Sequence, residues 1–162
     1  MKLTSLCTAA VLALSVGSAG ANILADGDFE AFDPMVVSGS YATVNAPGSL
    51  GAWTVGGVSV DLIQNAFGAI TNVSVDLAGT PGPGFLSQSF MAIAGYTYTL
   101  TFDVSNNGGT QLDVTLGQLP TATYTPTNTV TGYTLVWTAL AGGMESVKFD
   151  SVLGSNSGPV ID

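Results

Sequence analysis

Several aromatic and polar side chains of this chain have the chemistry that a saccharide-binding surface needs. Aromatic rings pack against the C–H faces of a sugar ring, while amides and carboxylates bond to its hydroxyls and fix its orientation. Two alternatives stay open, because Trp53 and Trp137 also suit a hydrophobic core and Asn106-Asn107 also suits a turn. The candidates for sugar contact are Trp53, Tyr41, Tyr133, Asp61, Gln64, Asn106 and Asn107.

Few residues of this chain are of the types that carry out catalysis. The chain contains no histidine and a single cysteine, Cys7, so a serine or cysteine nucleophile activated by imidazole is excluded. A carboxylate pair, as in glycosidases, is the remaining option, but no spacing in the sequence brings two aspartates into one cleft. We therefore expect a protein that is not an enzyme. The aspartates on predicted strands are Asp61, Asp76, Asp103, Asp113 and Asp150.

The N-terminus has the organisation of a secretory signal peptide. Lys2 provides the positive charge, residues 3–16 form an apolar run, and small residues lead to a predicted cleavage site after Ala21. The run is shorter than the roughly 20 apolar residues of a spanning helix, although an uncleaved membrane anchor is an alternative. Residues 1–21 are thus predicted to be removed. The exported part lacks cysteine, which favours a bacterial origin and a fold stabilised by its core.

The charge balance limits the partners. The chain carries two basic and eleven acidic residues, for a formal net charge of −9. Binding to phosphate backbones and to anionic lipid surfaces relies on lysine and arginine, so neither nucleic acid nor a membrane surface is expected as a partner. Neutral sugars and calcium remain compatible with this charge.

Alternating hydrophobicity is the main structural signal. In residues 96–105, Tyr96, Tyr98, Leu100, Phe102 and Val104 fall on one face and polar residues on the other, which predicts a half-buried strand. Two of the predicted segments, 96–105 and 111–116, flank an Asn-Asn-Gly-Gly turn and are expected to form a hairpin, and 121–125 is expected to pair with 131–140. Residues 22–30 are predicted to start as a short strand that runs into a turn at Asp26-Gly27. The other predicted strands are 41–44, 58–63, 74–77, 85–91 and 146–152.

This pattern favours a single all-β domain over residues 22–162. Many short strands separated by glycine, proline and asparagine, with no helical period, predict an antiparallel sandwich or barrel. The final residues, 160–162, have the pattern of the first half of a strand. We therefore expect the last strand to be truncated.

Several separated motifs of the chain match those of one known family. Residues 22–30 contain Gly-x-Phe-Glu, with Asp26 where asparagine is usual, and the other matching motifs lie at residues 74–79, 86–90, 94–103 and 158–162. Together they resemble the choice-of-anchor C family of secreted bacterial galactose-binding-like domains. More distantly, the chain is similar to carbohydrate-binding modules. The resemblance implies a galactose-binding-like jelly-roll β-sandwich, export, and attachment to the cell envelope.

The resemblance also implies a structural calcium ion that ties the two ends of the domain together. In the related modules the glutamate of Gly-x-Phe-Glu and an aspartate opening the last strand hold the ion. The matching residues are Glu30 and Asp162, with Asp28 as a further ligand. Calcium prefers several oxygen ligands of this kind. The alternative is that these are solvated carboxylates in an acidic chain.

Together these observations predict a non-catalytic exported carbohydrate-binding module acting at the cell surface or in the extracellular matrix. Its partner would be a polysaccharide or cell-surface glycan. The alternative is a structural envelope or matrix protein without a small ligand. An exposed aromatic platform beside amides or carboxylates favours the first function, and fully buried rings with a flat threonine-rich surface favour the second.

Overall fold

The computed structural model describes residues 22–109, 111–153 and 156–162, with the side chain of residue 153 excepted. The predicted signal peptide, residues 1–21, lies outside the described residues. The described part of the chain contains no helix that is long and apolar enough to cross a membrane.

The described part of the protein is nearly all β, with 54% of the described residues in strands and 4% in helix. One short 3₁₀ helix, η1 (Glu30–Met35), precedes the strands. The strands are β1 (Tyr41–Asn45), β2 (Gly48–Leu50), β3 (Trp53–Gly57), β4 (Ser59–Ile63), β5 (Ser74–Asp76), β6 (Ala78–Gly79), β7 (Gly82–Ala92), β8 (Thr97–Asn106), β9 (Gln111–Leu116), β10 (Ala122–Tyr124), β11 (Thr131–Thr138), β12 (Gly143–Leu153) and β13 (Pro159–Ile161).

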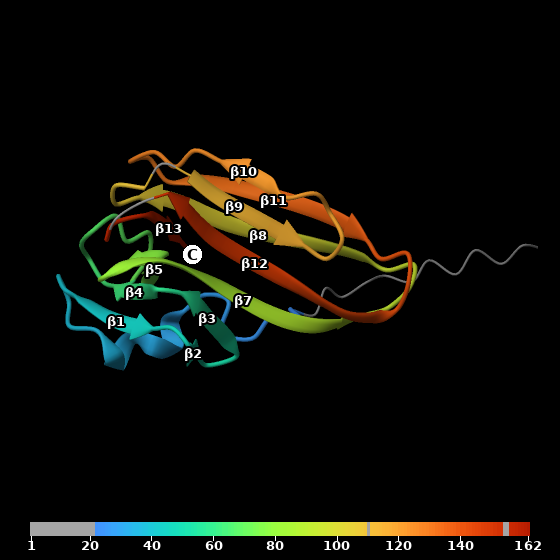
Figure 1. Ribbon diagram of the computed structural model, residues 1–162, viewed down its shortest axis with the longest axis horizontal. Coiled ribbons are helices and arrows are strands. Elements are labelled where there is room, and N and C mark those ends of the chain that lie inside the picture. The colour runs from blue at the N-terminus through green and yellow to red at the C-terminus, as the bar shows by residue number, and fades with distance from the viewer. Residues whose placement is uncertain (1–21, 110, 154–155) are drawn as a thin grey trace, which may run out of the picture.

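Two sheets face each other as a sandwich (Figure 1). The first has the order β1-β4-β5-β13-β8-β11, and the second has the order β10-β9-β12-β7-β3-β2, with β6 paired to β7. All of the strand pairs described are antiparallel, as in β8–β11, β7–β12 and β13–β8. The predicted fold class, an antiparallel β-sandwich of the jelly-roll kind, is confirmed.

The core is filled by the apolar faces that the alternation predicted. On β8, Leu100, Phe102 and Val104 are buried, and on β12 Val147 and Phe149 are buried. Successive side chains of a strand point to opposite faces, so these residues turn inward while their neighbours face solvent. The rings also contact one another across the two sheets, with the centroids of Phe102 and Phe149 5.2 Å apart.

The predicted hairpins are wrong. β8 pairs with β11 and β13 in the first sheet, whereas β9 pairs with β10 and β12 in the second. The turn after Asn106 therefore carries the chain from one sheet to the other, and β10 and β11 likewise belong to different sheets. Turn residues mark where a strand ends, but they do not determine which strand becomes the partner.

The short strand predicted at the start of residues 22–30 is also wrong, because residues 22–29 form no strand and η1 begins at Glu30. The predicted turn at Asp26-Gly27 is present, and Asp26 has a φ value of 50° there. This segment is held instead by Gln88 of β7, whose side-chain amide bonds to both the N–H and the C=O of Ala25 at 2.8 and 2.9 Å. Phe29 is buried beside Trp53.

Candidate functional site

The most distinctive surface of the described chain is formed by residues 64–73, which connect β4 to β5 and are called the 64–73 loop below. Asn65 and Phe67 have φ values of 54° and 58°, in the left-handed region. A bulky residue rarely adopts this conformation unless the surrounding structure enforces it, and such positions cluster at ligand-binding sites. The conformation of the loop turns the Phe67 side chain toward solvent.

Phe67 forms an exposed aromatic pair with Tyr41 of β1. The rings are 43% and 47% exposed, respectively, and their centroids lie 5.9 Å apart at an interplanar angle of 81°. Beside them, the side-chain amide of Asn65 donates a hydrogen bond to the Ser38 hydroxyl at 2.9 Å. Two aromatic rings and an amide thus lie together at the surface.

The centre of the loop is fixed against the end of β8. The Ser105 hydroxyl donates a hydrogen bond to the Gly68 carbonyl oxygen. A Cβ atom at Gly68, where φ is 84°, would lie 2.9 Å from the Asn106 carbonyl oxygen. Only glycine combines this φ with so close an approach, so Gly68 holds the loop on the strand.

The two predicted asparagines lie near this contact but use their side chains within the fold. Asn106 Oδ1 accepts a hydrogen bond from the Gly108 N–H at 2.9 Å, which is turn chemistry. Asn107 Nδ2 donates to Asp76 Oδ2 at 2.8 Å. Burial raises the pKa of Asp76 to about 6, with a smaller contribution from the charge of Asp61, while the bond from Asn107 opposes the shift.

Three other predicted contact residues are buried. Trp53 is 2% exposed and its indole N–H donates to the Asp26 carbonyl at 3.0 Å, so its ring offers no face to a ligand. Asp61 is 5% exposed, and its Oδ2 accepts bonds from the N–H and hydroxyl of Thr80 at 3.1 and 3.3 Å. Gln64 is 7% exposed and donates to Asp33 and to Asn72. Gln64 therefore supports the 64–73 loop from beneath.

The far end of the loop lies against both ends of the described domain, at an acidic cluster formed by Glu30 and Asp162 around Thr71. Thr71 Oγ1 lies 3.1 Å from Glu30 Oε1, 3.3 Å from the Val73 carbonyl oxygen, and within hydrogen-bonding distance of Asp162 Oδ2. A hydroxyl has one proton to donate. Three oxygen acceptors therefore converge on a group that can satisfy one of them.

The pKa values of the two carboxyl groups in this cluster move in opposite directions. Desolvation raises the pKa of Glu30, but the hydrogen bonds from Asn72, Val73 and Thr71 outweigh it and leave the net pKa below the usual value. Desolvation raises the pKa of Asp162 to about 6, the Thr71 hydroxyl opposes this, and the charges of Glu30, Asp103 and Asp28 add to it. The charges of the predicted residues Glu30 and Asp28 thus both act on the third predicted residue, Asp162.

The donor set of this cluster suits a hard cation. No group of three or more histidine, cysteine, aspartate or glutamate side chains among the described residues is arranged to hold a metal ion. However, two carboxylates, the Thr71 hydroxyl and the Val73 carbonyl supply oxygen atoms of the kinds that calcium accepts. A cation bound there would neutralise the negative charge of the two carboxylates, although Glu30 also accepts hydrogen bonds from the Val73 N–H at 3.2 Å and from the Asn72 amide at 3.0 Å.

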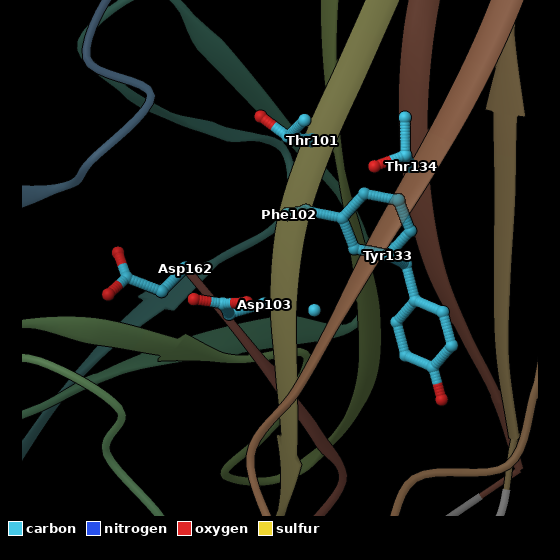
Figure 2. Close-up of a pocket in the computed structure, with 7 residues that line it drawn as sticks. Thr101, Phe102, Asp103, Tyr133, Thr134 and Asp162 are labelled. Carbon is cyan, nitrogen blue, oxygen red and sulfur yellow. The ribbon is translucent and has the colours of Figure 1, made fainter.

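A shallow hollow of about 380 Å³ opens next to Asp162. Asp103 of β8 exchanges both backbone hydrogen bonds with Asp162, at 2.9 and 3.1 Å, and Figure 2 shows the two carboxylates side by side. Gly132 of β11 lies opposite Asp103, and its missing side chain leaves the hollow open. The lining residues are Thr101, Phe102, Asp103, Gly132, Tyr133, Thr134 and Asp162.

Phe67, Thr71 and Asp103 were not among the residues predicted to form a site. A signal existed for Phe67, because an aromatic residue between Asn65 and Gly68, in a break between two strands, is expected on an exposed turn. Asp103 lies at a polar position of a strand in which polar and apolar residues alternate, so its sequence predicts exposure to solvent but no site. Thr71 has no distinguishing pattern, since its role depends on two carboxylates that are distant in sequence.

No protein-family model and no curated protein matches the chain. Several solved structures, in contrast, do match it. The carbohydrate-binding module TmCBM61, in complex with β-1,4-galactotriose, is 13% identical over 88% of this chain and 95% of that one, with a TM-score of 0.56. A family 16 carbohydrate-binding module is 19% identical over 64% and 81%, with a TM-score of 0.49. A family 35 module from Clostridium thermocellum is 18% identical over 76% and 94%, with a TM-score of 0.45. The likeness to TmCBM61 shows that the two chains share a β-sandwich fold.

Proposed function

We propose that the protein is a non-catalytic, exported carbohydrate-binding module that binds a polysaccharide or cell-surface glycan on the 64–73 loop. The observation that carries this proposal is the exposed pair of Tyr41 and Phe67 rings beside the amide of Asn65. The pair meets the criterion of an exposed aromatic platform next to hydrogen-bonding side chains.

The chemistry of the pair suits a neutral sugar. Each ring offers an apolar face to the C–H groups of a pyranose, and Asn65 can exchange its bond to Ser38 for one to a sugar hydroxyl. Full burial of an exposed apolar side chain contributes about 1.5–3 kcal/mol. Because the two rings are 43% and 47% exposed, a sugar that covers both gains only part of this from each ring, which corresponds to weak binding. The formal charge of −9 is compatible with an uncharged ligand.

The same proposal assigns calcium to the acidic cluster, as a structural ion. Glu30, Asp162, the Thr71 hydroxyl and the Val73 carbonyl would be its ligands, with the charge of Asp28 adding to the attraction. The ion would fix one end of the 64–73 loop. Asn72 extends this support, because it bonds to Glu30 at 3.0 Å and accepts a bond from Gln64 at 3.0 Å.

The shared fold and the sequence motifs support the proposal from two sides. TmCBM61 has the same β-sandwich and was solved with β-1,4-galactotriose, so this sugar is a reasonable first probe. The resemblance to the choice-of-anchor C family supports export and a place at the cell envelope.

A specific observation favours a second candidate, a structural matrix protein without a small ligand. Trp53 and Trp137 are both buried, and most of the side chains exposed on the outer face of β8 and β11 are threonines: Thr97, Thr99, Thr101, Thr134 and Thr138. Thr97 and Thr138 are hydrogen-bonded across this face at 2.9 Å. Such a face suits contact with other polymers more than the capture of one sugar.

A glycan-array screen separates the two functions. The wild-type protein is applied together with Phe67→Ala and with Val136→Ala, a matched control that removes an exposed apolar side chain from β11. A carbohydrate-binding module should bind a defined set of glycans, lose that binding in Phe67→Ala, and keep it in Val136→Ala. The absence of glycan binding by the folded wild-type protein would exclude the proposal and leave the structural function.

A further inference from the structure

Two carboxylates lie opposite each other on the first sheet, on the face that points away from the core. Asp61 of β4 and Asp76 of β5 are direct partners in the antiparallel register, so their side chains share one face. Their neighbours Leu62 and Val75 point into the core from the other face. The two carboxylates are nevertheless 5% and 1% exposed, so other segments of the chain cover them.

One of the covering segments is β6, together with the turn that leads from it to β7. A Cβ atom at Gly79 would lie 2.6 Å from the carbonyl carbon of Val60, so β6 lies directly on β4. Thr80 donates its N–H and its hydroxyl to Asp61 Oδ2 at 3.1 and 3.3 Å. One oxygen of Asp61 is thus held by two donors.

The other oxygen of Asp61 has no donor. Asp76 Oδ1 accepts the N–H of Ala78, and Asp76 Oδ2 accepts the side-chain amide of Asn107, both at 2.8 Å. Asp61 Oδ1, by contrast, is buried and accepts no hydrogen bond from the described residues. A buried carboxylate oxygen without a donor is costly, so its occurrence in a folded protein calls for an explanation.

No positive charge among the described residues can neutralise this pair. Lys148 is the one basic residue of the described part, and it bonds to Asp150 on β12 of the other sheet. A carboxyl group that retains its proton can instead donate it to the neighbouring carboxylate. Burial, with a smaller contribution from the charge of Asp61, raises the pKa of Asp76 to about 6. Asp76 therefore holds the proton, and Asp61 Oδ1 is its acceptor.

The elements packed against the pair contribute no further charge within the described part of the chain. In the register of the sheet, Thr43 of β1 lies opposite Asp61, and Val160 of β13 lies opposite Asp76. The covering side chains of the threonine, alanine and asparagine named above are also neutral. The ionisation of this pair thus depends on the two aspartates alone.

Asn107 connects the pair to the 64–73 loop. Its amide is held by Asp76, and the carbonyl oxygen of the preceding residue, Asn106, lies where a Cβ atom at Gly68 would approach it to 2.9 Å. Next to this contact, the Ser105 hydroxyl donates to the Gly68 carbonyl oxygen. Gly68 directly follows the exposed phenylalanine of the loop. The carboxyl pair therefore supports the end of β8 on which the loop rests.

We propose that Asp61 and Asp76 share one proton at acidic pH, and that release of this proton to solvent loosens the 64–73 loop and weakens glycan binding. Two ionised carboxylates repel each other strongly in a buried site, and their separation displaces Asn107 and the end of β8. The effect on binding rests on the proposed carbohydrate function, whereas the shared proton and its effect on the loop do not. The glycan site is thus regulated by pH and releases its ligand as the pH approaches neutrality.

An NMR titration of the free protein between about pH 4.5 and 7.5 provides the first test. The side-chain amide of Asn107 and the backbone amide of Gly68 should shift together, with one midpoint near pH 6. The amide of Thr71 reports separately on the acidic cluster, because the Thr71 hydroxyl bonds to Asp162, whose pKa is also raised to about 6. The two carboxyl groups are thereby distinguished within one experiment.

Variants of the pair identify the titrating group. Asp76→Asn keeps the size of the side chain but cannot ionise, so it should abolish the shifts at Asn107 and Gly68 and retain those at Thr71. Asp61→Asn removes the repelling charge and should move the midpoint to lower pH. If Asp76→Asn does not fold, as judged by circular dichroism, the midpoint of Asp61→Asn decides the question.

Asp113→Asn is the matched control. It removes one carboxylate from β9 of the other sheet, where Asp113 accepts hydrogen bonds from Gln111 and Thr123 at 3.1 and 2.7 Å. The net charge changes as it does in the other two variants. The amides of Asn107 and Gly68 should titrate in this variant as they do in the wild type.

Glycan affinity at about pH 5 and 7.5 provides the second test. Calorimetry with β-1,4-galactotriose, or with a glycan selected on the array, should give binding that is at least about fivefold weaker at the higher pH. Asp76→Asn should bind with the same affinity at both pH values, and Asp113→Asn should keep the pH dependence of the wild type.

Each contrary outcome overturns a defined part of the proposal. An Asn107 side chain that does not titrate would exclude the shared proton, and a Gly68 amide that stays unchanged while Asn107 titrates would exclude the coupling to the loop. Equal glycan affinity at both pH values would exclude the regulation and leave the carbohydrate function intact. No glycan binding at either pH would instead refute the carbohydrate function, while the amide titration still decides whether the proton controls the loop.

Discussion

The carboxylates of Glu30 and Asp162 both approach the hydroxyl of Thr71, so the two ends of the described domain meet at one side chain of the 64–73 loop. The loop that carries the exposed Phe67 ring is therefore held at its far end by an acidic cluster. Any change in the charge of that cluster is expected to affect the loop.

Calcium should stabilise the protein through this cluster. An ion bound only by the native state at 100 times its dissociation constant adds about 2.7 kcal/mol of stability, which for a chain of this size raises the melting temperature by several degrees. A thermal melt with calcium, and then with a chelator, measures the shift. Glu30→Gln should remove most of it.

Glu145→Gln is the matched control, because Glu145 lies on β12 and bonds to Gln118 at 2.8 Å, away from the loop. It should retain the calcium shift of the wild type. An equal shift in Glu30→Gln and in the wild type would contradict the assignment of the ion to this cluster.

Stability should decrease as the pH rises from about 4 to 7. Burial raises the pKa of Asp76 from 3.8 to about 6, so the folded state retains a proton that the unfolded chain releases. The stability that this proton contributes is fully present below the pKa of the unfolded state, about 3.8, and is lost as the pH rises to the pKa of the folded state, about 6. The total loss is about 3 kcal/mol. Asp162, with its pKa also raised to about 6, acts in the same direction.

Urea unfolding at a series of pH values measures this dependence. Asp76→Asn should flatten the decrease, because the neutral amide has no proton to lose. A variant curve that runs parallel to the wild-type curve over this range would show that Asp76 does not titrate as its burial indicates.

Trp53→Phe should affect stability and leave glycan binding intact. The substitution removes the indole N–H that donates a hydrogen bond to the Asp26 carbonyl oxygen at 3.0 Å. It also leaves a small void beside Phe29 and Phe149. We expect a loss of about 1–3 kcal/mol in unfolding free energy. A folded Trp53→Phe protein that no longer binds glycans would instead place Trp53 in the binding surface.

The strands were predictable because their signal is local. The alternation of residues 96–105 and 146–152 gives the inner and outer faces of β8 and β12 as the structure has them. The pairing of strands was not predictable, because Asn106 to Gly109 ends β8 in the same way whether the chain turns back or crosses to the other sheet. The strand predicted before Glu30 failed because its backbone follows contacts with Gln88 and Trp53 that are distant in sequence.

The candidate site was predictable only in part. The proximity of Glu30, Asp28 and Asp162 followed from a resemblance, and Tyr41 was recognised by residue type. By contrast, Phe67 acquires its importance from its exposure beside Tyr41, and Thr71 from its position between two carboxylates. Both properties depend on the position of the 64–73 loop in the folded chain, which brings Phe67 beside Tyr41 and Thr71 between the two carboxylates.

The central claim, that the 64–73 loop binds carbohydrate, is tested most directly by an NMR titration of the protein with β-1,4-galactotriose and then with the glycans selected on the array. The account predicts chemical-shift changes concentrated at Tyr41, Asn65 and Phe67, and their loss in Phe67→Ala. Changes concentrated elsewhere, for example on the outer face of β9 and β12 around Asp113 and Lys148, or no changes with any selected glycan, would contradict it.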